Sequence, residues 1–154
     1  YSLDVMASQR DSDGGSIASD YVVGNMYPEV SGMLTDYTGT IYEGNTCSVD
    51  GISEPDNISY LPKYKVLLIG EDTGRHQNDY VWAYDVETGI LQRIASTPYG
   101  AETTSPFWHT NINGYGYITL VTQHPFGESD EDKIFSPEDK ESYIGYIGPF
   151  PALD

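Results

Sequence analysis

Apolar residues occur along the chain in short runs and alternations, a pattern that predicts strands and only one short helix. Residues 65–72 (KVLLIGED) contain the continuous apolar run of a buried strand, and residues 80–85 (YVWAYD) alternate like a half-buried strand. Residues 86–89 (VETG) supply a turn, after which residues 90–96 (ILQRIAS) return as the hairpin partner. The middle of the chain is therefore predicted to form consecutive antiparallel strands.

The C-terminal region continues the strand pattern. After a predicted loop over residues 97–113, residues 114–123 (GYGYITLVTQ) predict a strand, and residues 142–154 predict one more strand that Gly and Pro bring to an end. Between them, Ser136-Pro137-Glu138-Asp139 has the features of a helix start, with Ser at the N-cap, Pro at the first position and acids in the first turn. The expected helix is short.

The N-terminal region, residues 1–45, is rich in Gly and Ser and is weakly specified. Residues 11–16 (DSDGGS) predict an exposed loop, and short strand-like pieces fall at residues 21–23 and 40–42. We therefore divide the chain into a weakly specified segment, 1–45, and a strand-rich segment, 46–154.

The spacing of strand, turn and strand suits the blades of a β-propeller, which take about 40–45 residues each. At that size the chain holds about three blades, whereas closed propellers typically have about four to eight. We predict an all-β fold that is part of a β-propeller. Its open sheet edges need a cover, supplied by the remainder of the propeller chain or by a neighbouring subunit.

Amino-acid composition supports a strand-rich fold, and net charge argues against nucleic acid and anionic membranes as partners. The chain has 14 Tyr, 16 Gly and 9 Pro, a mixture that favours strands joined by turns. Its 24 acidic and 7 basic residues give a formal net charge of −17, which repels nucleic acid and anionic membrane surfaces. No apolar run is long enough for a membrane span. Such acidity is consistent either with a solvated surface or with bound divalent cations.

Cysteine content and the N-terminal residue add two expectations. Cys47 is the single cysteine, which excludes an internal disulfide and a Cys-rich zinc site and is typical of a small buried residue. The chain opens at Tyr1 with neither Met nor a leader, so we expect a processed or partial product.

Four acidic groups lie where predicted strands meet loops. In chain order they are Glu54, Asp56 and Asn57; Glu71 and Asp72; Glu102; and Gln123 and His124, followed by Glu128, Asp130 and Asp132. In a propeller, strand ends of successive blades converge on the central channel, where carboxylates from several blades can form one hard-oxygen cation site. The alternative is that each acid is a solvated turn former or cap.

The same residues carry a resemblance to a known family. Residues 54–89 (EPDNISYLPKYKVLLIGEDTGRHQNDYVWAYDVETG), then TPYGAETTSPFW, NGYGYITLVTQHPFGESDEDK and YIGYIGPFP, resemble in order and spacing the C-terminal region of the PhoX family of alkaline phosphatases. The resemblance covers about residues 46–151. It implies a six-bladed propeller that hydrolyses phosphate monoesters at a Ca²⁺ and Fe³⁺ cluster in the channel, in a secreted or periplasmic protein.

The resemblance also implies roles for particular residues. Glu102 matches an acidic position that we take as a catalytic metal ligand. The other matching positions are expected around the same cluster; they are Asp56, Asn57, Glu71, Asp72, Gln123 and His124. The family binds iron partly through a cysteine in the N-terminal part of its propeller. Cys47 does not match that cysteine, so the use of Fe³⁺ rests on the resemblance alone.

Arg75, His76 and His109 lie outside these expected ligand positions. Arg75 is a candidate for binding the substrate phosphate, the alternative being a surface ion pair with Asp72 or Asp79. His76 is interpreted as a surface-loop histidine, the alternative being that it orients a phosphate or a ligand. His109 is interpreted as a loop packing residue. A site lined with carboxylates would repel a phosphomonoester dianion unless metal ions reverse the local charge, so metal ions are expected to perform the chemistry. The chain has no GxSxG or Ser-His-Asp pattern.

Two functions from different classes follow from the sequence. The first is metal-dependent phosphomonoester hydrolysis, with an active centre completed by further chain. The second is a non-catalytic propeller fragment that Ca²⁺ stiffens and that acts as a binding module or as a subunit of an extracellular assembly.

Overall fold

A computed structural model of the chain describes residues 1–127, 134 and 136–153, in two compact units, Tyr1–Ser31 and Gly32–Asp154. The unit boundary therefore lies earlier than the division at residue 45 that the sequence suggested. Residues following Ser31 belong to the second unit because they bond to it: Leu34 forms a bridge with Cys47, and the Asn45 side chain accepts the backbone N–H of Gln77. Three of the acids that the sequence analysis singled out, Glu128, Asp130 and Asp132, lie outside the described residues.

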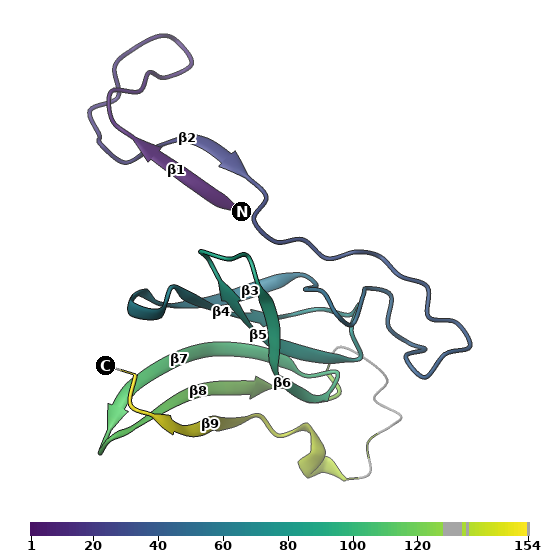
Figure 1. Cartoon of the computed structure of the whole chain (residues 1–154). Coiled ribbons are helices and arrows are strands. Elements are labelled where there is room, and N and C mark those ends of the chain that lie inside the picture. Colours follow the sequence, from purple (N-terminus) through teal and green to yellow (C-terminus); the bar gives the residue numbers. More distant parts are fainter. Residues whose placement is uncertain (128–133, 135, 154) are drawn as a thin grey trace. The chain divides into compact units, whose positions relative to one another are not determined.

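The first unit is built on a two-stranded antiparallel sheet (Figure 1) of β1 (Ser2–Met6) and β2 (Val22–Tyr27). The strand-like piece at residues 21–23 is thus the beginning of β2. The exposed loop predicted for residues 11–16 is confirmed, and it is held by the Asp11 carboxylate, which accepts the backbone N–H groups of Asp13 and Gly15.

The first sheet of the second unit is a four-stranded antiparallel meander, as predicted from its apolar pattern. It has the order β3 (Pro55–Leu61), β4 (Val66–Glu71), β5 (Asn78–Asp85) and β6 (Leu91–Tyr99), with a short 3-10 helix, η1 (Pro62–Tyr64), between β3 and β4. β5 is buried along most of its length rather than on one face, because side chains on both of its faces are covered. Leu68, Val81 and Trp82 form the centre of this core.

The second sheet has the order β7 (Glu102–Ile112), β8 (Tyr115–Gln123) and β9 (Tyr143–Pro151). The loop predicted for residues 97–113 is therefore wrong: β6 runs on to Tyr99, and β7 occupies most of the remainder. Pro106 made the segment resemble a loop. The strand accommodates this proline at an irregularity between Thr104 and Phe107, where Ser105 takes a positive φ of 54°.

Two shorter predictions have opposite outcomes. The strand-like piece at residues 40–42 is wrong, because the chain there forms successive turns in which Tyr37 accepts the N–H of Thr40 and Thr40 accepts the N–H of Glu43. The short helix is confirmed as the 3-10 helix η3 (Pro137–Lys140), which begins after Ser136. Among the described residues, no helix has the length and apolar character that a membrane-spanning helix needs.

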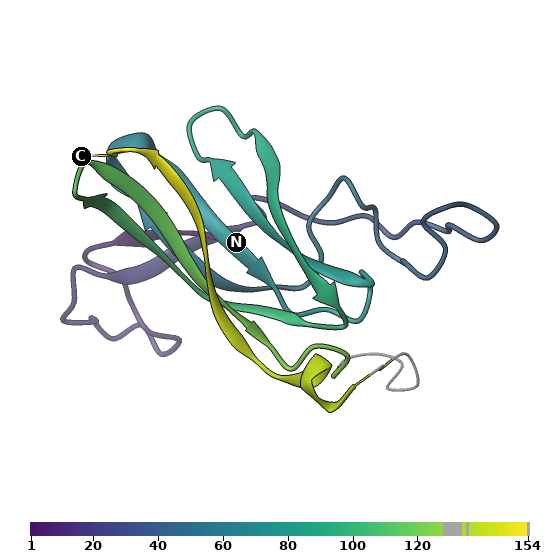
Figure 2. The same ribbon diagram turned by 90° about the horizontal axis from the view of Figure 1, so that it is seen from below.

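The two sheets of the second unit pack against each other through β7, which contacts β3, β4 and β5 (Figures 1 and 2). Gly70 on β4 allows a close approach of β7, because a Cβ atom at this position would lie 2.4 Å from Oγ1 of Thr103. Two successive antiparallel meanders whose first strands, β3 and β7, touch each other are consistent with a propeller fragment. The fold class is thus all-β, with two sheets of blade size in the second unit.

Candidate metal centre

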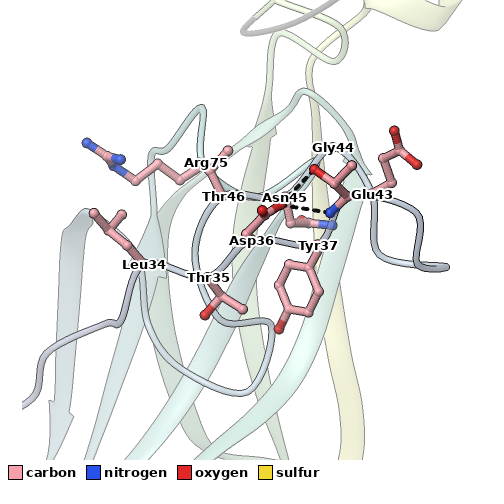
Figure 3. A pocket seen from close by; sticks show the side chains of 10 residues that line it. Leu34, Thr35, Asp36, Tyr37, Glu43, Gly44, Asn45, Thr46 and Arg75 are labelled. Atoms are coloured by element: carbon pink, nitrogen blue, oxygen red, sulfur yellow. Dashed lines mark hydrogen bonds between the residues drawn. The ribbon is translucent and has the colours of Figure 1, made fainter.

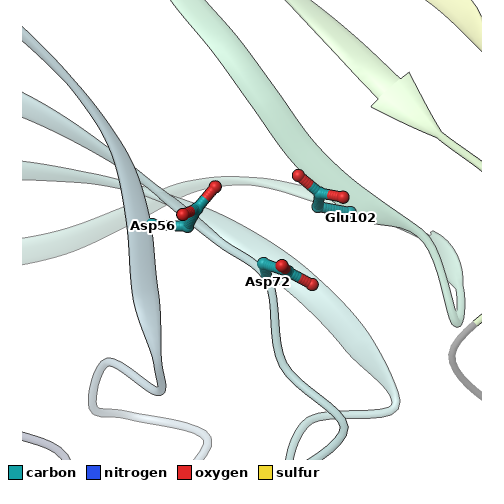
Figure 4. Close-up of side chains that lie close together, drawn as sticks. All are labelled: Asp56, Asp72 and Glu102. Atoms are coloured by element: carbon teal, nitrogen blue, oxygen red, sulfur yellow. The ribbon is translucent and has the colours of Figure 1, made fainter.

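Three of the residues predicted to bind metal lie together. One carboxylate oxygen from each of Asp56, Asp72 and Glu102 lies within 4.8 Å of the other two (Figure 4). Glu102 is only 8% exposed, whereas the two aspartates are exposed. We call these three residues the acidic triad.

Local backbone geometry brings the acidic triad together from three separate segments. Asp56 lies at an irregularity in the pairing of β3 with β4, between Pro55 and Asn57, and such bulges redirect side chains. Asp72 directly follows β4, and its N–H donates to the carbonyl of Glu54. Glu102 is the first residue of β7. The triad therefore joins the entry of β3, the exit of β4 and the entry of β7.

The electrostatics of the triad disfavour three simultaneous charges. Burial raises the pKa of the Glu102 carboxyl above its usual value, and the nearby charges of Asp72 and Asp56 raise it further. The hydrogen bond and the charge of His124 act in the opposite direction. A cation at this position would remove the repulsion that raises the pKa of Glu102.

Gln123 and His124 lie beside Glu102 rather than in the triad itself. Nε2 of Gln123 donates to Oε2 of Glu102 at 2.8 Å, and Nε2 of His124 lies 3.2 Å from the same oxygen. Their place follows from the pairing of Glu102 with Gln123 across β7 and β8. Asn57, another predicted site residue, donates its side-chain amide to the carboxylate of Asp56. These three residues are placed to orient the carboxylates of the triad.

The structure does not group Glu71 with the triad. Its side chain is fully buried, and its carboxylate accepts the N–H groups of Ser53 and Tyr80 and the indole N–H of Trp82, at 2.7–2.9 Å. Nδ1 of His76 lies 2.9 Å from Oε2 of the same carboxylate. With four partners inside the core, Glu71 links β4, β5 and the segment before β3.

His76 was interpreted from the sequence as a surface-loop residue, and that interpretation is wrong. Its side chain is fully buried between the Glu71 carboxylate and the carbonyl of Ser48, which lies 3.1 Å from Nε2. Its ring also packs on Tyr80, with the ring centroids 4.7 Å apart. The sequence did contain a signal for this buried polar cluster, because Glu71 directly follows the continuous apolar run of a buried strand.

Arg75 forms an ion pair with a residue other than the two considered from the sequence. Its Nε atom lies 3.3 Å from Oε1 of Glu54, and both side chains are about half exposed. Arg75 also lines a cavity of about 680 Å³ formed mainly by residues 34–38 and 43–46. Figure 3 shows the Arg75 guanidinium and the Glu43 carboxylate extending to opposite sides of this cavity. No member of the acidic triad lines it.

The remaining singled-out residues have packing roles. Cys47 is buried, as predicted, and its thiol lies 3.7 Å from the carbonyl of Ile52. His109 lies on β7 rather than in a loop, with Nε2 3.0 Å from the hydroxyl of Thr119 on β8.

Comparisons of the chain with protein-family models, with curated proteins and with solved structures find no match.

Proposed function

We propose that the acidic triad binds a divalent cation, with Ca²⁺ as the expected ion, and that the chain is part of a larger PhoX-like propeller that hydrolyses phosphate monoesters. The observation that carries the proposal is the convergence of Asp56, Asp72 and Glu102 within 4.8 Å. These residues come from three separate segments of the chain, and the resemblance implies a place near the metal cluster for each of them.

The chemistry of the donors fits a hard cation. Three carboxylates supply oxygen ligands only, which suits Ca²⁺, an ion that takes about six to eight oxygens. The remaining positions are available to water, to backbone carbonyls or to residues that complete the propeller. The proposed role of Fe³⁺ has no support beyond the resemblance.

The chain's own residues have distinct parts in this proposal. Asp56, Asp72 and Glu102 hold the ion, while Gln123 and His124 fix the orientation of Glu102 through their hydrogen bonds. A bound divalent cation would offset two of the three carboxylate charges of the triad and would present a positive centre that could polarise a phosphoryl oxygen. Arg75, whose side chain is about half exposed and forms an ion pair with Glu54, is the proposed contact for the substrate phosphate.

The proposed location rests on the resemblance, and the chemistry of the site is consistent with it. Three carboxylates, two of them exposed, are suited to an ion that is abundant, and extracellular calcium modules bind with dissociation constants of about 10⁻⁴–10⁻³ M. We accordingly propose a secreted or periplasmic location.

The second candidate function is a non-catalytic, Ca²⁺-stabilised module. It is favoured by one observation. Asp56 on β3 and Asp72 after β4 belong to the four-stranded sheet, whereas Glu102 is the first residue of β7 in the three-stranded sheet. A cation at this point would cross-link the two sheets whether or not catalysis takes place.

The experiment that separates the two functions uses the longest protein that contains this chain. Glu102→Gln keeps the size of the side chain and removes its charge, so hydrolysis of a chromogenic phosphate monoester should fall by orders of magnitude. Glu87→Gln, in the exposed turn after β5, is the matched control and should keep full activity. Equal activity of the two variants would contradict the catalytic role of the triad. The 154-residue chain alone is expected to be inactive, since ligands from other blades are needed.

A further inference from the structure

The buried side chain of His76 faces a hydrogen-bond acceptor at each ring nitrogen. Nε2 lies 3.1 Å from the carbonyl oxygen of Ser48, and Nδ1 lies 2.9 Å from Oε2 of Glu71. A carbonyl oxygen only accepts, so Nε2 must carry a hydrogen. In a neutral imidazole the other nitrogen is then an acceptor. Nδ1 therefore meets Glu71 either as an acceptor from a protonated carboxyl or as a second N–H.

The hydrogen bonds of Glu71 decide between these two arrangements. Its carboxylate accepts the backbone N–H groups of Ser53 and Tyr80 and the indole N–H of Trp82. Three such donors stabilise the charged form of a carboxylate over the protonated form. A charged carboxylate has no proton to offer to Nδ1, so the proton lies on the histidine ring. His76 is then an imidazolium that donates at both nitrogens, and the core holds a buried ion pair.

Other titratable groups lie on the elements packed around this pair. They are Tyr80 and Asp79 on β5, Arg93 on β6, Tyr37 near the 45–53 segment, and Arg75, which is paired with Glu54. Tyr80 packs on the imidazole, and burial raises the pKa of its phenol, which stays neutral. Arg93 opposes a second positive charge, but its guanidinium lies against the Tyr80 ring, whereas the Glu71 carboxylate contacts the imidazole directly. The nearer charge dominates, because Coulomb interactions weaken with distance.

The ion pair holds residues 45–53, which we call the 45–53 segment. This segment precedes β3 and belongs to no strand of the first sheet. The carbonyl of Ser48 bonds to His76, and the N–H of Ser53 bonds to Glu71, so both members of the pair bind its backbone. The segment also contributes buried apolar side chains to the core; they are Cys47, Val49 and Ile52. The pair therefore fixes a part of the core that no strand pairing secures.

We propose that His76 is a pH-sensitive latch, whose buried imidazolium ties the 45–53 segment to β4 and whose deprotonation weakens that tie. Loss of the proton leaves the Ser48 carbonyl or the Glu71 carboxylate without its donor, and a buried charge that loses its partner is strongly destabilising. The latch contains no member of the acidic triad, so it operates in the metal-free chain and does not depend on the proposed function.

The direction of the pH dependence follows from proton linkage. A histidine in an unfolded chain releases its proton at about pH 6.5. Above that pH the folded chain keeps a proton on His76 that the unfolded chain has lost, so stability falls as the pH rises. For one proton, the equilibrium constant of unfolding should increase by up to about tenfold for each pH unit. The loss ends at the pH where the folded chain also releases the proton.

The first test is nitrogen-15 NMR of the histidine rings in the whole wild-type chain, in a chelator at about pH 7.5. We expect two ring N–H groups and the nitrogen shifts of an imidazolium for His76. His109 is the internal comparison, because its Nε2 contacts the hydroxyl of Thr119, which can donate or accept, and it needs no second proton. A neutral ring at His76 would overturn the proposal.

The second test is thermal unfolding in the same chelator between about pH 6.5 and pH 9. His76→Gln supplies an N–H donor that does not titrate, so its melting temperature should fall less over this range than that of the wild type. His109→Gln is the matched control and should keep the wild-type dependence. Equal dependence in His76→Gln and the wild type would overturn the proposal. The NMR measurement uses the wild type and decides the question even if His76→Gln does not fold.

Hydrogen exchange tests whether the latch is local. As the pH rises over the same range, the protection factor of the Ser53 amide, which donates to Glu71, should fall by a larger factor than those of the amides of β8. An equal loss of protection in the 45–53 segment and in β8 would contradict a latch that acts on this segment.

Discussion

The hydroxyl of Thr103 on β7 bonds to both backbone groups of Glu71 on β4: it accepts the N–H at 2.7 Å and lies 3.1 Å from the carbonyl oxygen. Thr103 is almost fully buried, and the absent Cβ atom of Gly70 makes room for it. Asp72 follows Glu71 and Glu102 precedes Thr103, so this contact between the sheets sets the distance between two members of the acidic triad.

Replacing Thr103 tests that contact. Thr103→Val keeps the shape of the side chain and removes the hydroxyl, which leaves buried polar groups of Glu71 without this partner. The free energy of unfolding should fall by about 1–3 kcal/mol, and Ca²⁺ affinity should fall as well. Denaturant unfolding and calcium titration measure the two effects. Thr103→Ser keeps the hydroxyl and should restore most of the affinity; failure of serine to do so would contradict the role of the hydrogen bond.

Glu71 offers a test that separates a structural acid from a metal-binding one. Both of its carboxylate oxygens accept hydrogen bonds, so Glu71→Gln turns an NH₂ group toward donors in a fully buried site. We expect a loss of roughly 3–5 kcal/mol in the free energy of unfolding, the same with and without Ca²⁺. Glu87→Gln should change it by no more than about 0.5 kcal/mol. A loss seen only in the presence of Ca²⁺ would instead place Glu71 among the ligands.

The raised pKa of Glu102 predicts how stability depends on pH without metal. Its folded-state pKa lies above its unfolded-state value, so between the two values the folded chain binds more protons than the unfolded chain. The stability of the cation-free chain should therefore fall as the pH rises from the ordinary glutamate pKa, about 4.3, through the raised value.

Thermal unfolding in a chelator between about pH 4 and pH 7 measures this dependence. Glu102→Gln removes the titrating group, so its melting temperature should fall less over this range than that of the wild type. Identical profiles for the wild type and Glu102→Gln would contradict the assignment of the shifted group.

Much of the fold was predictable because its strands have local signals. The continuous apolar run of β4 and the turn after β5 specify a hairpin through neighbouring residues alone. β7 was missed because Pro106 is a loop signal in sequence, whereas the structure accommodates it at a bulge beside Ser105. The turn at residues 40–42 was missed because short runs of Thr, Ile and Tyr have strand propensity that local hydrogen bonds override.

The candidate site was predictable in part. Asp56, Asp72 and Glu102 could be grouped because each lies at the end of a strand. Glu71 was placed with them because it neighbours Asp72, but successive residues of an extended chain point to opposite sides. Its buried contacts with His76 and Trp82 depend on the packing of β4 against β5 and the preceding segment, which no local pattern encodes.

Titration of Ca²⁺ into the purified chain, after bound metal has been removed and with the heat of binding measured by calorimetry, tests the central claim most directly. The acidic triad predicts saturable Ca²⁺ binding that Asp56→Asn, Asp72→Asn and Glu102→Gln each weaken by a large factor, and that Glu87→Gln leaves unchanged. Bound Ca²⁺ should also raise the melting temperature of the wild type. Absence of saturable binding, or equal binding by the Glu102→Gln and Glu87→Gln variants, would contradict a metal centre at the acidic triad.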